Sequence, residues 1–255
     1  MAALIHEDRR RAGSFGEDAA QYDRARPSYP SPLVDNLMAD SPRRVLDVGC
    51  GTGIAGRLFS ARGCEVLGIE PDPRMAEVAR AHGLAVEVST FELWDPQGRT
   101  FDLLVSGQAW HWVDPSRGPA KAADVIRPGG RLAAFWNYGT HEPEVSAAFD
   151  GVYESVASEL REAYALGKLP PDDGGRQAID ADGRYEPTEV HTYEWRRRYT
   201  RDEWLDQLPT HSDHRLLSPE RLTVLLDAVG DTIDDLGGSI LVSYRTQLIT
   251  ARRQF

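Results

Sequence analysis

Five short apolar runs alternate with helical patterns between residues 45 and 136 of this 255-residue chain. Runs of this length, bounded by glycine, proline and charged residues, predict buried strands. The predicted strands are 45–48, 65–70, 84–88, 101–106 and 131–136. The predicted helices between them are 54–62, 73–81 and 116–125. This repeated order predicts a parallel sheet with helices on both faces, whose carboxyl edge holds the ligand.

The regular alternation stops after Tyr138. The pattern there predicts helices over 143–166, 201–208 and 219–233, strands over 190–199 and 239–250, and a mobile loop over 168–187 that is rich in Gly, Pro and Asp. Before the first strand, predicted helices at 15–23 and 33–39 flank a proline-locked segment. The expected organisation is an N-terminal segment (1–40), a core (41–139), an inserted helical cap with the mobile loop (140–187), and two last strands with cap helices (188–255).

The charge balance argues against a nucleic-acid partner. The chain has 29 basic and 40 acidic residues, a net charge of -11, which repels a phosphate backbone. The cationic run Arg196–Arg198 is interpreted as a solvated face. Cys50 and Cys64 have no CxxC partner, and no apolar run is long enough to span a membrane. We therefore expect a cytoplasmic monomer or homodimer that acts on a small molecule, with neither nucleic acid nor membrane as a partner.

A glycine-rich loop, Gly49-Cys50-Gly51-Thr52-Gly53, joins the first predicted strand to the first helix. Glycines let the backbone turn sharply and approach a ligand, and N–H groups at the helix start face it. The overlapping stretch Gly51–Gly56 also matches the dinucleotide fingerprint GxGxxG. Glu70 ends the second strand 19 residues after Gly51 and suits ribose hydroxyls in either case. The early start at Gly49 and the carboxylate of Asp47, which would repel a pyrophosphate, favour a cationic cofactor.

The sequence Asp-Val-Gly-Cys-Gly-Thr-Gly resembles motif I of the class I S-adenosylmethionine-dependent methyltransferases. Phe15-Gly16 with Tyr22 and Arg26–Pro30, Gln108–Trp112, and Arg127–Gly130 are similar to the trans-aconitate-methyltransferase-like branch, which carries a methyltransferase type 11 domain. This resemblance implies an α/β, Rossmann-like fold with seven mostly parallel strands, an antiparallel last strand and a helical cap. It also implies that Glu70 holds the ribose, that residues 1–40 form a lid, and that S-adenosylhomocysteine is the product.

The residues expected to bind the cofactor come from the N-terminal segment and from the strand ends. The guanidinium of Arg26 suits the cofactor's carboxylate, unless the segment is only a surface arm. The resemblance places the adenine near Thr90 and Phe91, although core packing explains Phe91 equally well. The full expected set is Tyr22, Arg26, Asp47, Gly49, Gly51, Gly53, Glu70, Pro71, Thr90, Phe91 and Gln108.

His111 is the candidate general base, because an imidazole titrates near neutrality. The alternative is a structural histidine packed between Trp110 and Trp112, since methyl transfer often needs only positioning. Aromatic faces attract a sulfonium, so both tryptophans are expected at the substrate. Asn137 and Tyr138, after the fifth strand, complete the expected substrate contacts.

The segment Thr210–Arg215 contains His211, Asp213 and His214, but neighbouring residues rarely form a coordinated set, so we expect a substrate-pocket lid and no metal. The expected reaction is methyl transfer from S-adenosylmethionine to a small molecule, including one of secondary metabolism. The alternatives are cyclisation or aminocarboxypropyl transfer from the same cofactor, a non-catalytic binding module, and a nicotinamide oxidoreductase.

Overall fold

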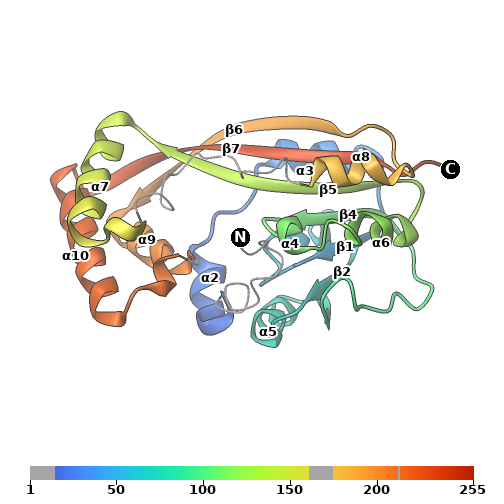
Figure 1. Ribbon diagram of the computed structural model, residues 1–255, viewed down its shortest axis with the longest axis horizontal. Coiled ribbons are helices and arrows are strands. Elements are labelled where there is room, and N and C mark those ends of the chain that lie inside the picture. The colour runs from blue at the N-terminus through green and yellow to red at the C-terminus, as the bar shows by residue number, and fades with distance from the viewer. Residues whose placement is uncertain (1–14, 161–174, 212) are drawn as a thin grey trace.

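One seven-stranded sheet organises the part of the chain that the computed structural model describes, residues 15–160, 175–211 and 213–255. Its strands are β1 (Arg44–Val48), β2 (Glu65–Glu70), β3 (Ala85–Val88), β4 (Phe101–Gly107), β5 (Ile126–His141), β6 (Glu189–Thr200) and β7 (Ser239–Arg252). Their order is β3-β2-β1-β4-β5-β7-β6. The first five strands pair in parallel, and β7 runs antiparallel to both β5 and β6 (Figure 1). The predicted Rossmann-like fold with an antiparallel last strand is therefore confirmed.

β5 is much longer than the predicted strand 131–136. It begins at Ile126, so the turn expected over Arg127–Gly130 lies inside the strand. It continues to His141 because β7 pairs with it without interruption from Arg131 to His141. An antiparallel partner that lies far away in the sequence thus sets the length of β5, and the local pattern underestimates it.

Helices cover the sheet at the positions that the pattern predicts, with shifted ends. They are α2 (Ala19–Ala25), α3 (Ser31–Met38), α4 (Ile54–Ser60), α5 (Pro73–Ala81), α6 (Gly118–Val125), α7 (Pro143–Val156), α8 (Arg176–Asp182), α9 (Arg201–Gln207) and α10 (Pro219–Asp235). The prediction of a mobile loop over 168–187 is wrong for residues 176–182, because α8 forms there and buries Ile179 completely. Residues 1–14, 161–174 and 212 lie outside the described part of the chain.

Three apolar clusters fill the space between sheet and helices. One lies under α3, α4 and α5, and a second lies on the opposite face under α6 and α8. The third joins α7, α9 and α10 to the end of β6 and the first half of β7, and forms a helical lobe seen at the left of Figure 1. α2 contacts both α5 and α9, so it bridges the core and the lobe (Figure 1). Among the described helices, none has the length and apolar character to cross a bilayer.

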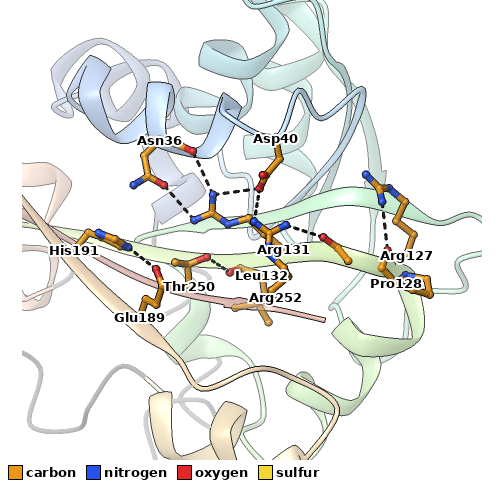
Figure 2. Close-up of polar contacts among 11 residues, drawn as sticks. Asn36, Asp40, Arg127, Pro128, Arg131, Leu132, Glu189, His191, Thr250 and Arg252 are labelled. Atoms are coloured by element: carbon orange, nitrogen blue, oxygen red, sulfur yellow. Dashed lines mark hydrogen bonds and ion pairs between the residues drawn. The ribbon is translucent and has the colours of Figure 1, made fainter. Parts of the chain in front are cut away.

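A polar network fastens α3 to the sheet, away from the carboxyl edge (Figure 2). The guanidinium of Arg131, on β5, donates to the backbone oxygen of Asn36 at 3.2 Å and to its Oδ1 at 3.1 Å. Asp40 follows α3 and accepts from Arg252 at 2.9 Å, with Arg131 3.6 Å away. The Arg131 side chain is only 12% exposed, so its guanidinium is shielded from water, whereas the Asp40 side chain is 41% exposed.

We expect Arg131→Met to lower the free energy of unfolding by about 1–3 kcal/mol, because the Asn36 oxygens and Asp40 lose a charged donor in a shielded position. The matched control is Arg62→Met, which removes the exposed pair between Arg62, just after α4, and Asp35 on α3, and should change stability by less than about 0.5 kcal/mol. Urea unfolding of the two variants measures the difference. Equal effects would show that burial of the Arg131 network adds nothing.

Candidate active site

The glycine loop at the end of β1 adopts a backbone conformation that favours glycine. Gly49 and Cys50 both donate their N–H groups to the backbone oxygen of Ile69, at 2.8 and 3.1 Å. Gly49, Gly51 and Gly53 have φ values of 68°, 55° and 87°, the left-handed region that favours glycine. A Cβ on Gly49 would also lie 2.5 Å from the Cβ of Ala109. The loop therefore needs glycine here to pass close to the end of β4.

Glu70, the last residue of β2, holds this loop in place. Its Oε2 accepts the N–H of Gly51 at 2.8 Å, and its Oε1 accepts the N–H of Asp72 at 2.9 Å. Burial raises the pKa of Glu70 to about 7, although these two N–H groups pull it down. The carboxylate lies in the wall of a cavity at the carboxyl edge of the sheet, where it can accept hydrogen bonds from a ligand.

Asp47 lies directly beneath the loop and is fully buried. Neither of its carboxylate oxygens has a hydrogen bond of standard distance and angle among the described residues, although the N–H of Gly56 lies near them. Burial raises its pKa to about 7, the charge of Glu70 adds to that rise, and the N–H of Gly56 opposes it. Asp47 does not line the cavity, so its contact with the cofactor stays a prediction. Its charge can still act through the loop, because a cation above it would stabilise the ionised form.

The cavity opens between the carboxyl ends of β1, β2, β3 and β4 and has a volume of about 130 Å³. Nine predicted residues line it: Tyr22, Gly49, Gly51, Glu70, Pro71, Thr90, Phe91, Gln108 and Trp112. The sequence-based set omitted eight others: Val48, Ile69, Met75, Ser89, Glu92, Gly107, Ala109 and Val113. Most of these follow or end a strand, a position that could have indicated them. Met75 lies inside α5, and its pattern is that of an ordinary core residue.

The N-terminal segment lies over the end of β4. The ring of Tyr29 packs edge-on against Phe135 at 4.6 Å, and its hydroxyl would lie 2.6 Å from a Cβ on Gly107. Arg26 lies over the ring of Tyr22 at 5.1 Å and donates to the backbone oxygen of Thr210 at 2.7 Å. The guanidinium of Arg26 is therefore directed to the helical lobe and is absent from the cavity wall, whereas Tyr22 lines the cavity.

His111 is held by Trp136. The indole Nε1 of Trp136 donates to Nδ1 of His111 at 3.1 Å. With the ring in this orientation, the lone pair of Nδ1 is occupied and the proton of the neutral ring lies on Nε2. Such a histidine donates from Nε2 and cannot accept a proton unless it releases Trp136. His111 also does not line the cavity, so this geometry argues against its predicted role as a general base.

Three predicted substrate residues lie outside the cavity wall. Trp110 is 3% exposed and packs in the core, its ring 6.2 Å from that of Phe91, so packing accounts for it. Asn137 donates to the backbone oxygen of Ser28 at 3.0 Å and accepts from the hydroxyl of Thr246 at 2.6 Å. Tyr138 lies on the other face of β5 and packs against the core cluster that contains Trp110.

The histidines of 210–215 belong to the interior of the helical lobe. Nε2 of His214 lies 2.7 Å from the hydroxyl of Tyr153, and its Nδ1 lies 3.4 Å from Asp213. Burial and the nearby charge of Arg26 hold the pKa of His211 well below its usual range. In the described part of the chain, no group of three His, Cys, Asp or Glu side chains is placed to hold a metal ion.

Comparison with known proteins points to one group of enzymes. A family model described as a methyltransferase domain matches residues 46–134. An uncharacterised methyltransferase of Mycobacterium tuberculosis is 41% identical over 126 residues, 49% of this chain and 52% of that protein. A ubiquinone biosynthesis O-methyltransferase of Hahella chejuensis is 36% identical over 108 residues, 39% of this chain and 45% of that protein. The chain thus spans about half the length of the curated relatives that it matches.

Solved structures share the fold. A provisionally named type II methyltransferase from Anaeromyxobacter dehalogenans superposes with a TM-score of 0.63 at 24% identity, over 89% of this chain and 97% of that one. A phosphoethanolamine N-methyltransferase from Haemonchus contortus gives a TM-score of 0.54 at 16% identity, over 99% and 59% of the two chains. At these identities the likeness concerns the fold alone.

We expect Asp47→Asn to stabilise the protein more at pH 8 than at pH 5. The pKa of Asp47 rises from 3.8 to about 7 on folding, so the folded state binds the extra proton, and wild-type stability falls as pH rises through that window. The variant carries no such cost, and its advantage should grow by about 2–4 kcal/mol between the two pH values.

Urea unfolding at pH 5 and pH 8 measures this change. Asp35→Asn, at an exposed site on α3, is the matched control and should show no pH-dependent gain. An Asp47→Asn advantage that is the same at both pH values would contradict a raised pKa for Asp47.

Proposed function

We propose that this chain, which carries a class I S-adenosylmethionine-dependent methyltransferase domain, transfers a methyl group from S-adenosylmethionine to a small molecule, including one of secondary metabolism. The observation that carries the proposal is the glycine loop at the end of β1, which Glu70 clamps above the buried carboxylate of Asp47. A dinucleotide site is disfavoured by the same carboxylate, because its charge would repel a pyrophosphate placed on the loop.

The residues of the cavity fit this cofactor. Glu70 offers two carboxylate oxygens at the position where ribose hydroxyls need acceptors. Ile69, Phe91 and Val113 supply an apolar wall suited to an adenine ring. The charge of Asp47 beneath the loop stabilises a cation above it. When bound, S-adenosylmethionine supplies an electrophilic methyl carbon on a positively charged sulfur.

The residues of the cavity wall are better suited to position the reacting groups than to transfer a proton. Its two described carboxylates are engaged, Glu70 with Gly51 and Asp72, and Glu92 with the N–H of Asp114 at 2.8 Å. The ring of Trp112 adds an aromatic face, which favours a sulfonium. Alignment of the reacting atoms in such a site supplies a large part of the lowering of a methyl-transfer barrier. The acceptor therefore either carries no proton to lose or loses it to solvent.

The N-terminal segment 1–40 serves as the lid. Its described part reaches across the opening, because Tyr22 lines the cavity and Tyr29 covers Gly107. The cavity volume of about 130 Å³ lies below the roughly 300–1,000 Å³ of typical small-molecule sites. We infer that α2, which carries Tyr22, shifts when the whole cofactor enters. Salt bridges such as Arg24–Asp206, at 2.7 Å, would then re-form when the lid closes onto α9.

We expect Glu70→Gln to weaken S-adenosylmethionine binding by about tenfold, because an amide accepts less strongly from ribose hydroxyls than a carboxylate. Wild-type affinity should also fall as the pH drops below about 7, where Glu70 takes up a proton, while the variant should respond much less. Calorimetry between pH 6 and 8 measures both effects. Glu65→Gln, at the exposed start of β2, is the matched control and should bind normally.

The identity of the reaction has its own test. Incubation with S-adenosylmethionine and candidate acceptors should release S-adenosylhomocysteine. Release of methylthioadenosine would indicate cyclisation or aminocarboxypropyl transfer instead, and binding without turnover of any acceptor would indicate a binding module. NAD binding as tight as that of S-adenosylmethionine would overturn the cofactor assignment.

A further inference from the structure

A second hollow lies on the long strands β5, β7 and β6, and measures about 590 Å³. Its side chains come in two rows that run across the three strands in register. One row is Tyr138, Arg245 and Glu194, and the other is Thr140, Ser243 and Arg196. Residues paired in an antiparallel sheet point to the same face, so all six side chains project from one side.

The residues between the two rows point the other way. Gly139, Tyr244 and Trp195 are the register partners there, and the rings of Trp195 and Tyr244 stack at 4.3 Å against the helical lobe. They supply the floor of the hollow, while the charged and hydroxyl groups stand above it. The apolar contacts of these strands thus lie on one face of the sheet, and the polar hollow lies on the other.

The two arginines of this face differ in their ionic contacts from Arg197, which lies between Arg196 and Arg198 in the sequence. Arg197 points to the opposite face and pairs with Glu203 at 3.5 Å. Neither Arg196 nor Arg245 forms an ion pair within the described ranges of the chain, although the protein carries a net charge of -11. Glu194 lies opposite Arg245 and leaves the hollow with one net positive charge. Two guanidinium groups with one opposing carboxylate in a concave site suit a singly charged carboxylate ligand.

The hollow is connected to the cofactor cavity by a run of aromatic residues. Trp112 lines the cavity, and its ring lies 5.0 Å from that of His111. His111 in turn accepts from Trp136, which shares one face of β5 with Tyr138. Phe135 is in register with Gly107 at the cavity, and Tyr138 lies three residues further along β5. At about 3.3 Å per residue, the hollow begins about 10 Å from the cavity.

We propose that this hollow binds a carboxylate of the acceptor, held by Arg245 and Arg196, so that the acceptor reaches from the cofactor cavity to the hollow and carries an anionic group at that end. The identification of the bound molecule as the methyl acceptor rests on the proposed function. Binding of a carboxylate in the hollow does not depend on the cofactor. The hydroxyls of Thr140 and Ser243 add donors beside the guanidinium groups, and Glu194 selects acceptors with a donor next to the carboxylate.

The experiment titrates the full chain with 4-fluorobenzoate and with its uncharged isostere 4-fluorobenzamide, followed by ¹⁹F NMR. We expect saturable millimolar binding of the benzoate and at least tenfold weaker binding of the benzamide. Arg245→Gln and Arg196→Gln should each weaken benzoate binding about tenfold. Glu194→Gln should strengthen it about two- to threefold, since it removes the opposing charge.

Arg198→Gln is the matched control, because Arg198 lies on the same strand outside the hollow and donates to Ser239. It should bind benzoate as the wild type does. Failure of the benzoate to saturate, equal binding of the benzamide, equal loss in Arg198→Gln, or tighter binding of inorganic phosphate would each overturn the proposal. S-adenosylmethionine titrated into the same samples reports on the proposed function separately, and its affinity should be unchanged in all four variants.

Discussion

Two hydrogen bonds to one carboxylate set the geometry on which the rest of the site depends. Glu70 accepts from Gly51 and from Asp72, and so joins the loop after β1 to the turn after β2. The three left-handed glycines let the loop lie close enough for this contact. Asp47 lies beneath, and the charge of Glu70 raises the cost of ionising it. Ionisation of these buried carboxylates is therefore unfavourable, and a bound cation would make it favourable.

β7 plays the corresponding role for the other half of the molecule. It lies between β5 and β6 and joins them, since these two strands do not pair directly. The hydroxyl of Thr246 on β7 accepts from Trp195 at 2.8 Å and donates to Asn137, which in turn reaches Ser28 of the N-terminal segment. This chain of contacts fixes the lid segment relative to three strands. The same strand supplies the middle of both rows in the polar hollow.

The sequence was informative wherever a local pattern determines the structure. The strand-loop-helix unit around Gly49, the placement of Glu70 in the cavity wall and the seven-stranded fold could all be predicted. Trp110 and Trp112 could not be distinguished, because their neighbours are similar and only the fold buries one and exposes the other to the cavity. The bond from Trp136 to His111 and the register of Arg245 with Tyr138 join distant segments. Such pairings depend on the tertiary structure and leave no local signal.

The position of β7 in chain order has a consequence for how the protein is made. β5 is complete at His141, but its antiparallel partner begins only at Ser239. At about 5–20 residues per second, a ribosome needs roughly 5–20 s to synthesise the intervening stretch of about 100 residues. Through that interval β5 presents an open edge, and β6 joins it as a second unpaired strand. Nascent chains are therefore most vulnerable to intermolecular strand pairing just before synthesis of β7, and a chaperone that shields β5 would act in that interval.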